Sequence, residues 1–446
     1  MVINKLSSLL PEQTTTTPSY VNMDKVASIV LCGGEGKRLF PLTQKRCKPA
    51  LIFGGRYRLV DVPISSSINS GIRKIFLLTQ YLSAPLHQHI MSTYRFDSFS
   101  LGSIHLLSAE QNSKSNEWFE GTADAIRKMV DYIKDIPVEY FLILSGDQLY
   151  NIQFQRMVQM AKSYNADAVV ASTPVDMHNA KRMGIMKICD TGKILDFIEK
   201  PSQNQLKPFY ADADCINKLG INYYDKKNYI ASMGIYLFKR ELLLDLLSST
   251  NHSDFGKHLI PLTVTQGKTY SFLYNGYWED IGTVSSFYQA NLALTEYHPK
   301  LNCYDEKRLI YSTPHEDLPP PKILNCKLSQ TLVCEGSVID AKEITHSIIG
   351  TRSVLKKGCV IKDSYIMGND FYSPPVYTQT ELPQELCIDE NCRIEKSIID
   401  KNVYIGKGVK LINKNKLDYY DGGKIFIRDG IIIVMRGAHI PDGYEL

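Results

Sequence analysis

Residues 27–53, ASIVLCGGEGKRLFPLTQKRCKPALIF, are the stretch that decides the fold of the first half of the chain. The apolar run ASIVLC is too short and too β-branched for a helix, so it predicts a buried strand that ends in a glycine-rich turn. Open α/β sheets bind ligands just beyond the carboxyl ends of their strands. Glycines there let backbone N–H groups approach a polyphosphate closely, and Arg38 and Lys48 can add positive charge. We therefore expect an anion-binding site directly after this strand.

The composition restricts where such a site can lie. The 446 residues include 51 Lys and Arg against 47 Asp and Glu, a net charge of +4, which is too even for a general nucleic-acid binder. Any anion site must therefore be local. The local excess of positive charge between residues 33 and 58 comes from Lys37, Arg38, Lys45, Arg46, Lys48, Arg56 and Arg58 against the single acid Glu35.

Other features of the chain exclude several classes of protein. No apolar run approaches the roughly 18 residues of a membrane span, so we expect neither a membrane nor a nucleic-acid partner. The ten cysteines are scattered and form no C-x-x-C pair, which argues against a zinc site and a disulfide framework and favours a reducing compartment. Residues 1–24 have no long apolar core and little Arg, and we interpret them as a mobile tail.

The pattern of apolar residues divides the chain into two regions. Up to about Tyr297, short β-branched runs such as KIFLLTQ and EYFLILSGD alternate with helix-like segments, which predicts an α/β sheet with helices on both faces. A proline-bearing connector, YDEKRLIYSTPHEDLPPPKI at 304–323, follows. Beyond it, apolar residues recur every sixth position at Ile348, Val354, Val360 and Ile366, and again at Ile399, Ile405 and Leu411.

A six-residue apolar period is typical of a parallel β-helix, in which each coil buries one aliphatic side chain per face. An ordinary sandwich with evenly spaced strands is the alternative, and the repeated equal intervals favour the β-helix. The glycine turn after the first strand also has a simpler explanation as a tight turn, because its spacing matches neither the P-loop nor the dinucleotide-binding fingerprint.

Several motifs, taken in order, resemble those of a known family. GGEGKRLFPLTQKRCKP resembles the signature of sugar-nucleotide pyrophosphorylases. Together with YRLVDVPISSSINSGIRKIFLLTQY, WFEGTADAIR, LSGDQLY, FIEKP, ASMGIYLF, SDFGKHLIP and YWEDIGT, it is similar to glucose-1-phosphate adenylyltransferases. The resemblance runs from about Val26 to the C-terminus. It implies a Rossmann-like nucleotidyltransferase domain with a mixed sheet at 25–300, a linker at 301–322 and a left-handed parallel β-helix at 323–446.

The resemblance also implies an activity: AMP is transferred from ATP to α-D-glucose 1-phosphate, giving ADP-glucose and pyrophosphate for glycogen or starch synthesis. Mg²⁺, control by small phosphorylated effectors, a homotetramer, and a bacterial-type cytoplasmic location, with the plastid stroma as alternative, are implied with it. One rival is a pyrophosphorylase for another nucleotide or sugar phosphate. A second is a non-catalytic regulatory subunit, which the presence of Arg38, Lys48, Asp147 and Lys200 argues against. Acetyl transfer by the β-helix lacks a catalytic histidine, since His346 is the only one among the coils before His439.

The resemblance assigns roles to individual residues. Arg38, Lys48 and Asp147 are the expected catalytic residues, and Asp147 and Asp280, which alone would read as turn or cap residues, are the expected Mg²⁺ ligands. The expected ATP site comprises Leu31, Gly33, Gly34, Gln80, Gln111, Trp118, Gly121 and Asp124. The expected glucose 1-phosphate site comprises Gly184, Glu199, Lys200, Ser232, Tyr236, Asp254 and Trp278. The expected effector site comprises Lys45, Arg46, Arg58, Lys401 and Lys407.

Three positions depart from the family pattern. Lys37 stands where the family usually has Thr, and Phe119 stands where many bacterial members have Tyr. Gly437 occupies a position near the C-terminus where plant-type members have Lys, so Arg436 must substitute for that charge or the effector site is weaker.

Overall fold

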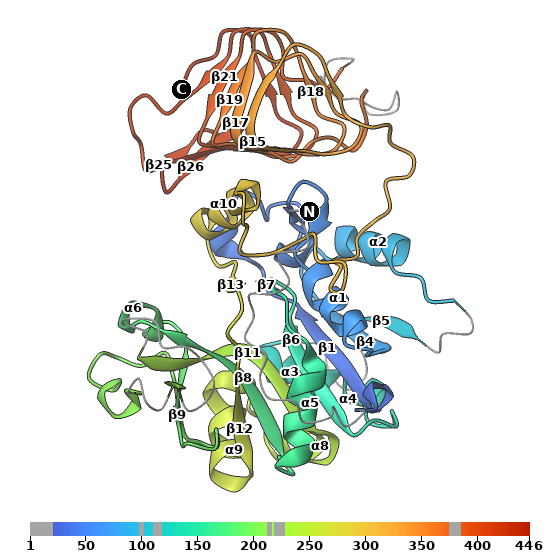
Figure 1. Ribbon diagram of the computed structural model, residues 1–446, viewed down its shortest axis with the longest axis vertical. Coiled ribbons are helices and arrows are strands. Elements are labelled where there is room, and N and C mark those ends of the chain that lie inside the picture. Colours follow the sequence, from blue (N-terminus) through green and yellow to red (C-terminus); the bar gives the residue numbers. More distant parts are fainter. Residues whose placement is uncertain (1–20, 98–101, 110–117, 212–215, 218–227, 374–384) are drawn as a thin grey trace, which may run out of the picture.

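The computed structural model describes residues 21–97, 102–109, 118–211, 216–217, 228–373 and 385–446, and it contains two domains (Figure 1). An α/β domain forms the lower body of the view, and a stack of short strands forms the upper one. No helix among these residues is long and apolar enough to cross a membrane.

The N-terminal domain is built on a nine-stranded mixed sheet, as predicted, with the order β10-β9-β11-β6-β1-β4-β5 and with β8 and β12 beyond β11. Strand β1 runs parallel to β4 and β6, whereas β11 runs antiparallel to β6. The strands are β1 (Val26–Cys32), β4 (Lys74–Thr79), β5 (Ser103–Ser108), β6 (Tyr140–Ser145), β8 (Ala168–Val175), β9 (Gly184–Ile188), β10 (Ile194–Glu199), β11 (Tyr229–Lys239) and β12 (Thr269–Leu273).

Helices cover both faces of this sheet. Successive side chains of its central strands point to opposite faces, so each face has a hydrophobic core of its own. Val30 belongs to the core beneath α1 and α5, and Ile29 belongs to the core beneath α3, α4, α8 and α9. The helices are α1 (Asp61–Asn69), α2 (Ala84–Thr93), α3 (Thr122–Lys128), α4 (Val130–Ile133), α5 (Phe154–Ser163), α6 (Met177–Ala180), α8 (Arg240–Ser249), α9 (Ile260–Gln266) and α10 (Val284–Leu292).

A small two-stranded sheet crosses the carboxyl end of the large one. Strand β7 (Gln148–Tyr150) pairs antiparallel with β13 (Trp278–Asp280), with Gln148 opposite Asp280. Because Asp147 immediately precedes β7, this pairing brings Asp147 and Asp280 to the same place despite their separation in the sequence.

The C-terminal domain is a stack of parallel coils, as the six-residue period predicted. One face is the ladder β15-β17-β19-β21-β24. Near the C-terminus come the antiparallel pairs β25-β26 and β26-β27, and the last strand, β28, returns to the stack parallel to β23. The strands are β14 (Lys322–Ile323), β15 (Lys327–Val333), β16 (Val338–Ile339), β17 (Glu343–Ile349), β18 (Val354–Leu355), β19 (Val360–Lys362), β20 (Tyr365–Ile366), β21 (Arg393–Glu395), β22 (Ser397–Ile399), β23 (Tyr404–Ile405), β24 (Lys410–Leu411), β25 (Tyr419–Asp421), β26 (Ile425–Arg428), β27 (Ile431–Val434) and β28 (His439–Ile440).

The predicted inward residues of the coils are correct at Ile366, Ile399, Ile405 and Leu411, all of which lie in the core of the coils. Ile348 is also buried, but it packs against the N-terminal domain, and Ile349 fills the core of the coils. The prediction was also wrong at Val354 and Val360, which are only half-buried. Their neighbours Leu355 and Ile361 fill the core instead. Each two- or three-residue strand carries adjacent apolar residues, and because side chains alternate along a strand only one of the two can point inward.

The two domains share one hydrophobic core. Ile348, Tyr365 and Met367 of the coils pack in the same cluster as Phe53 and Phe287 of the N-terminal domain. The hydroxyl of Tyr365 donates to the carbonyl of Ile52 at 2.9 Å. The position of the coils is therefore tied to the segment that follows the glycine turn.

Candidate active site

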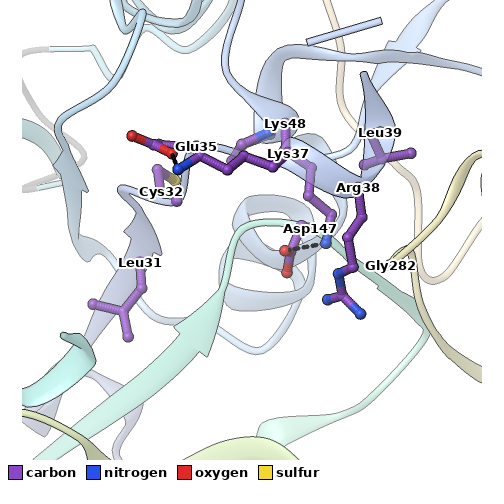
Figure 2. A pocket seen from close by; sticks show the side chains of 12 residues that line it. Leu31, Cys32, Glu35, Lys37, Arg38, Leu39, Lys48, Asp147 and Gly282 are labelled. Carbon is purple, nitrogen blue, oxygen red and sulfur yellow. Dashed lines mark ion pairs between the residues drawn. The ribbon is translucent and has the colours of Figure 1, made fainter. Parts of the chain in front are cut away.

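A cavity of about 430 Å³ opens at the end of β1, where the sequence predicted an anion site (Figure 2). Its lining is Leu31, Cys32, Gly34, Glu35, Gly36, Lys37, Arg38, Leu39, Lys48, Pro49, Asp147 and Gly282. Gly36 has φ 66°, and an added Cβ there would meet Thr43 and Lys48 at 3.1 and 3.2 Å. A residue with a side chain would therefore be strained at this turn and would crowd Lys48.

Lys48 lies between two carboxylates at the floor of this cavity. Its Nζ is 2.5 Å from Asp147 Oδ2 and 3.7 Å from Asp280 Oδ1, and its side chain is 11% exposed. The hydroxyl of Ser145 donates a short hydrogen bond to Asp147. Figure 2 shows the Lys48 and Asp147 pair beside Arg38, whose guanidinium extends toward Gly282.

The pKa of Asp280 depends on the groups around it. Burial raises the pKa of Asp280, the nearby Asp147 raises it further, and the positive charges of Lys48, Arg38 and Arg182 oppose that rise. Among the described residues, no three His, Cys, Asp or Glu side chains come together as a metal site. The protein can thus offer a cation two hard carboxylate ligands here, which suits an ion that completes its shell with phosphate oxygens and water.

A second, larger cleft of about 1,350 Å³ shares Arg38 and Gly282 with the first cavity. It is lined by six of the seven residues expected for the sugar phosphate: Gly184, Glu199, Lys200, Ser232, Tyr236 and Trp278. The seventh, Asp254, is not among the lining residues. It caps the π-helical segment Phe255–Leu259 by accepting from the N–H of Lys257 at 2.9 Å, and it lies close enough to Glu199 for its charge to act on that group.

The floor of the larger cleft requires glycine at position 184. An added Cβ there would lie 2.4 Å from the Phe197 ring and 2.7 Å from Glu199 Oε2. Burial raises the pKa of Glu199, and Lys200, whose Nζ is 3.8 Å from Glu199 Oε1, opposes that rise. A carboxylate and an ammonium thus stand at one end of the cleft, a pairing suited to hydroxyl and phosphate groups.

The structure adds a cleft residue to which the sequence assigned no role. The side-chain amide of Gln148 donates to the carbonyl of Met233 at 2.8 Å and accepts from the Trp278 indole at 3.3 Å. It therefore links Met233 and Trp278 in the wall of the larger cleft. Its position directly after Asp147 in FLILSGDQ was the signal available in the sequence.

The remaining residues expected for ATP that the structure describes follow β1 or β4, or stand before or in the first turn of α3. Gln80 Oε1 accepts from the N–H of Phe119 at 3.2 Å, and an added Cβ on Gly33 would touch Gln80 at 3.5 Å. Trp118 is 63% exposed. Gly121 precedes α3, and Asp124 accepts from the N–H of Glu120 at 3.0 Å. Gln111 lies outside the described residues.

The residues expected for effectors differ strongly in exposure. Lys45 is exposed, and Lys407 is 60% exposed beside Glu390. Arg46 is buried and its Nη2 lies 2.6 Å from Asp400 Oδ1. Burial lowers the pKa of Arg58.

Asp370 of the coils forms ion pairs with two cationic side chains near the domain boundary. Its carboxylate lies 2.5 Å from Lys401 Nζ and 2.6 Å from Arg436 Nη2. Burial lowers the pKa of Lys401, while Asp370 opposes that shift. Arg58 is close enough for its charge to act on both Asp370 and Lys401.

Comparison with known families agrees with this geometry. Residues 27–297 match the model of the nucleotidyl transferase family, and residues 317–444 match that of the GLGC left-handed parallel beta-helix domain. The chain belongs to the nucleotidyl transferase family. The combination of the two domains is the signature of glucose-1-phosphate adenylyltransferases, so the chain has the activity of these enzymes, which make ADP-glucose from ATP and glucose 1-phosphate. Nucleotidyl transferases generally use divalent metal ions.

Proposed function

We propose that the chain is a catalytic subunit that binds ATP in the first cavity and glucose 1-phosphate in the larger cleft, with Mg²⁺ held by Asp147 and Asp280. The observation that carries this proposal is the position of Lys48 between these two carboxylates, where the two cavities meet at Arg38 and Gly282. Reacting phosphates from both sides would come together at this point.

The reaction requires no covalent intermediate with the protein. A phosphate oxygen of glucose 1-phosphate attacks the α-phosphorus of ATP, a new P–O bond forms, and the bond from the α-phosphorus to the bridging oxygen breaks so that pyrophosphate leaves. The bound cation would offset phosphate charge. Arg38 and Lys48 supply fixed positive charge where negative charge moves from the α-phosphorus to the leaving group.

Lys48 has two alternative partners in this mechanism. In the structure its ammonium group is paired with Asp147 at 2.5 Å. A nucleotide phosphate in the first cavity would compete with Asp147 for this ammonium group, and Asp147 would then be one of the residues that hold the cation.

Glucose binding falls to the walls of the larger cleft. Glu199, buried enough for its pKa to be raised, accepts from sugar hydroxyls, and Lys200 binds the phosphate. Ser232 and Tyr236 lie on strand β11 and line the same cleft, and Trp278 would pack its indole ring against the hexose. Gly33, Gly34, Gln80 and the segment at Trp118 would enclose the nucleotide.

We also propose control by small phosphorylated metabolites, in a cytoplasmic homotetramer. Lys45, Arg58, Lys401 and Arg436 bring positive charge to the boundary between the domains, where an anionic effector could bridge them. Arg46 supports the boundary through its ion pair with Asp400 rather than through exposed contacts. Lys407, beside Glu390 and largely exposed, contributes least.

One assay tests the proposed function. The purified chain is incubated with glucose 1-phosphate, Mg²⁺ and each nucleoside triphosphate in turn, and pyrophosphate release is measured. We expect the highest kcat/KM with ATP. A clear preference for UTP or dTTP would contradict the nucleotide assignment, and absence of turnover with every nucleotide would favour a regulatory subunit.

A further inference from the structure

Arg182 lies on the wall of the sugar cleft but belongs to none of the motifs that the sequence resemblance assigned. It follows α6 and precedes β9, and its N–H donates to the carbonyl of Asn179 at 3.0 Å. The turn is itself anchored, since the carboxylate of Asp176 accepts from the N–H of Asn179 at 2.8 Å. The backbone that carries Arg182 is therefore held in place by local hydrogen bonds.

The strand pairing brings Arg182 and Lys200 to the same end of the cleft. Gly184 pairs with Glu199 in the β9–β10 hairpin, and the N–H of Lys200 donates to the carbonyl of Met183 at 2.9 Å. Arg182 stands in the turn that leads into β9, and both Arg182 and Gly184 line the cleft. The two cations thus project from adjacent chain segments.

Arg182 also shares the cleft with the reaction centre. It lines the larger cleft together with Arg38 and with Asp280, the carboxylate next to Lys48. The guanidinium is exposed to the cleft and has no ion-pair partner in the part of the chain that the structure describes. It is therefore an uncommitted cation in the cleft that Lys200 and Asp280 also line.

The other lysines of the cleft wall are already engaged. Lys181 Nζ donates to Gln203 Oε1 at 3.1 Å, and Lys300 is close enough to Glu279 to oppose the rise in the pKa of that group. Lys200 is a single point charge, 61% exposed, beside Glu199. A phosphate monoester carries up to two negative charges, and an arginine fork can bind two of its oxygens at once.

We propose that Arg182 binds the phosphate group of glucose 1-phosphate together with Lys200, and so sets the position of the attacking oxygen relative to Asp280. This inference rests on the proposed function, because it concerns the sugar phosphate that the larger cleft would hold. Arg182 and Lys200 bind the phosphate from neighbouring positions at one end of the β9–β10 hairpin. Arg38 binds the nucleotide.

The substitution Arg182→Gln tests the role, with Lys181→Gln as the matched control on the adjacent residue. We expect the KM for glucose 1-phosphate to rise about tenfold in Arg182→Gln, which corresponds to the loss of one charge-assisted contact. The KM for ATP should change less than twofold. Arg182→Lys should restore part of the affinity, and Lys181→Gln should behave as the unsubstituted protein.

A binding measurement separates this inference from the proposed function. Titration of the protein with inorganic phosphate, followed by ³¹P NMR without ATP, should show weaker binding in Arg182→Gln and unchanged binding in Lys181→Gln. If the unsubstituted protein makes no ADP-glucose, the proposed function fails, and the phosphate titration still decides the role of Arg182. If ADP-glucose is made but Arg182→Gln keeps both its KM for glucose 1-phosphate and its phosphate affinity, the inference is overturned.

Discussion

Arg46 Nη2 lies 2.6 Å from Asp400 Oδ1, and the two side chains are only 3% and 5% exposed. Arg46 belongs to the segment that also carries Lys48, and Asp400 follows β22 of the β-helix. The pair therefore fastens the coils to the segment that holds the reaction centre. Nε and Nη1 of Arg46 have no hydrogen-bond partner among the described residues, so Asp400 supplies the main compensation for the buried charge.

Removing Asp400 should destabilise the protein strongly. Asp400→Ala leaves the guanidinium of Arg46 buried without a counter-ion, and the free energy of unfolding should fall by about 3–5 kcal/mol. Denaturant unfolding followed by circular dichroism measures the change. The exposed pair of Lys407 and Glu390 provides the control, since Glu390→Ala should cost less than about 1 kcal/mol. Equal, small losses in both variants would show that the buried pair contributes little.

Asp147→Asn should abolish most of the activity without unfolding the chain. The amide keeps the size of the side chain but removes the charge that faces Lys48 and would face the cation. We expect kcat to fall by orders of magnitude and the thermal melt to stay within a few degrees. Steady-state kinetics over a range of Mg²⁺ concentrations is the measurement. Near-normal kcat with an unchanged melt would remove Asp147 from the mechanism.

Lys200→Ala should weaken the binding of one substrate only. The proposed partner of Lys200 is the sugar phosphate, so the KM for glucose 1-phosphate should rise far more than the KM for ATP. Lys187, exposed on the neighbouring strand β9 and outside the cleft lining, is the control, and Lys187→Ala should change neither KM. Similar increases for both substrates in Lys200→Ala would contradict the assignment.

The binding of glucose 1-phosphate should weaken as the pH falls, through protonation of Glu199. Burial raises the pKa of this carboxyl above its ordinary value, so protonation begins at a higher pH than for an exposed glutamate. The KM for glucose 1-phosphate should rise as the pH falls through that pKa. Glu199→Gln mimics the protonated form, so its KM should be high and should lose this pH dependence. An acid limb that persists in Glu199→Gln would belong to another group.

The double substitution Lys45→Ala with Lys401→Ala should abolish activation by fructose 1,6-bisphosphate or 3-phosphoglycerate. The unactivated rate should stay within a few-fold, since neither residue lines the two cavities. Because Lys401 also pairs with Asp370 at 2.5 Å, Lys45→Ala alone, at an exposed position, distinguishes lost effector binding from a loosened domain boundary. The regulatory proposal fails if neither metabolite, nor a panel of other sugar phosphates, activates the unsubstituted protein.

Local patterns in the sequence determined the main features of this protein. The run ASIVLC followed by glycines predicted a buried strand with an anion-binding turn, and the six-residue period predicted the coils. The strand and the coils are present as predicted, because strand formation and coil repetition depend on residues close together in the chain. Anion binding at the turn stays a prediction. The motifs around Asp147 and Lys200 marked the candidate site by resemblance.

Only the tertiary structure decided which of these residues meet, and how exposed they are. It placed Asp280 beside Asp147 through the pairing of β7 with β13, made Asp254 a helix cap outside the cleft lining, and gave the inward positions to Leu355 and Ile361 rather than to Val354 and Val360. It also buried Arg46, which the sequence presented like its exposed neighbour Lys45. Exposure and ion pairing depend on contacts between segments that lie hundreds of residues apart in the chain. The partner that stabilises a buried charge is therefore absent from the neighbouring sequence.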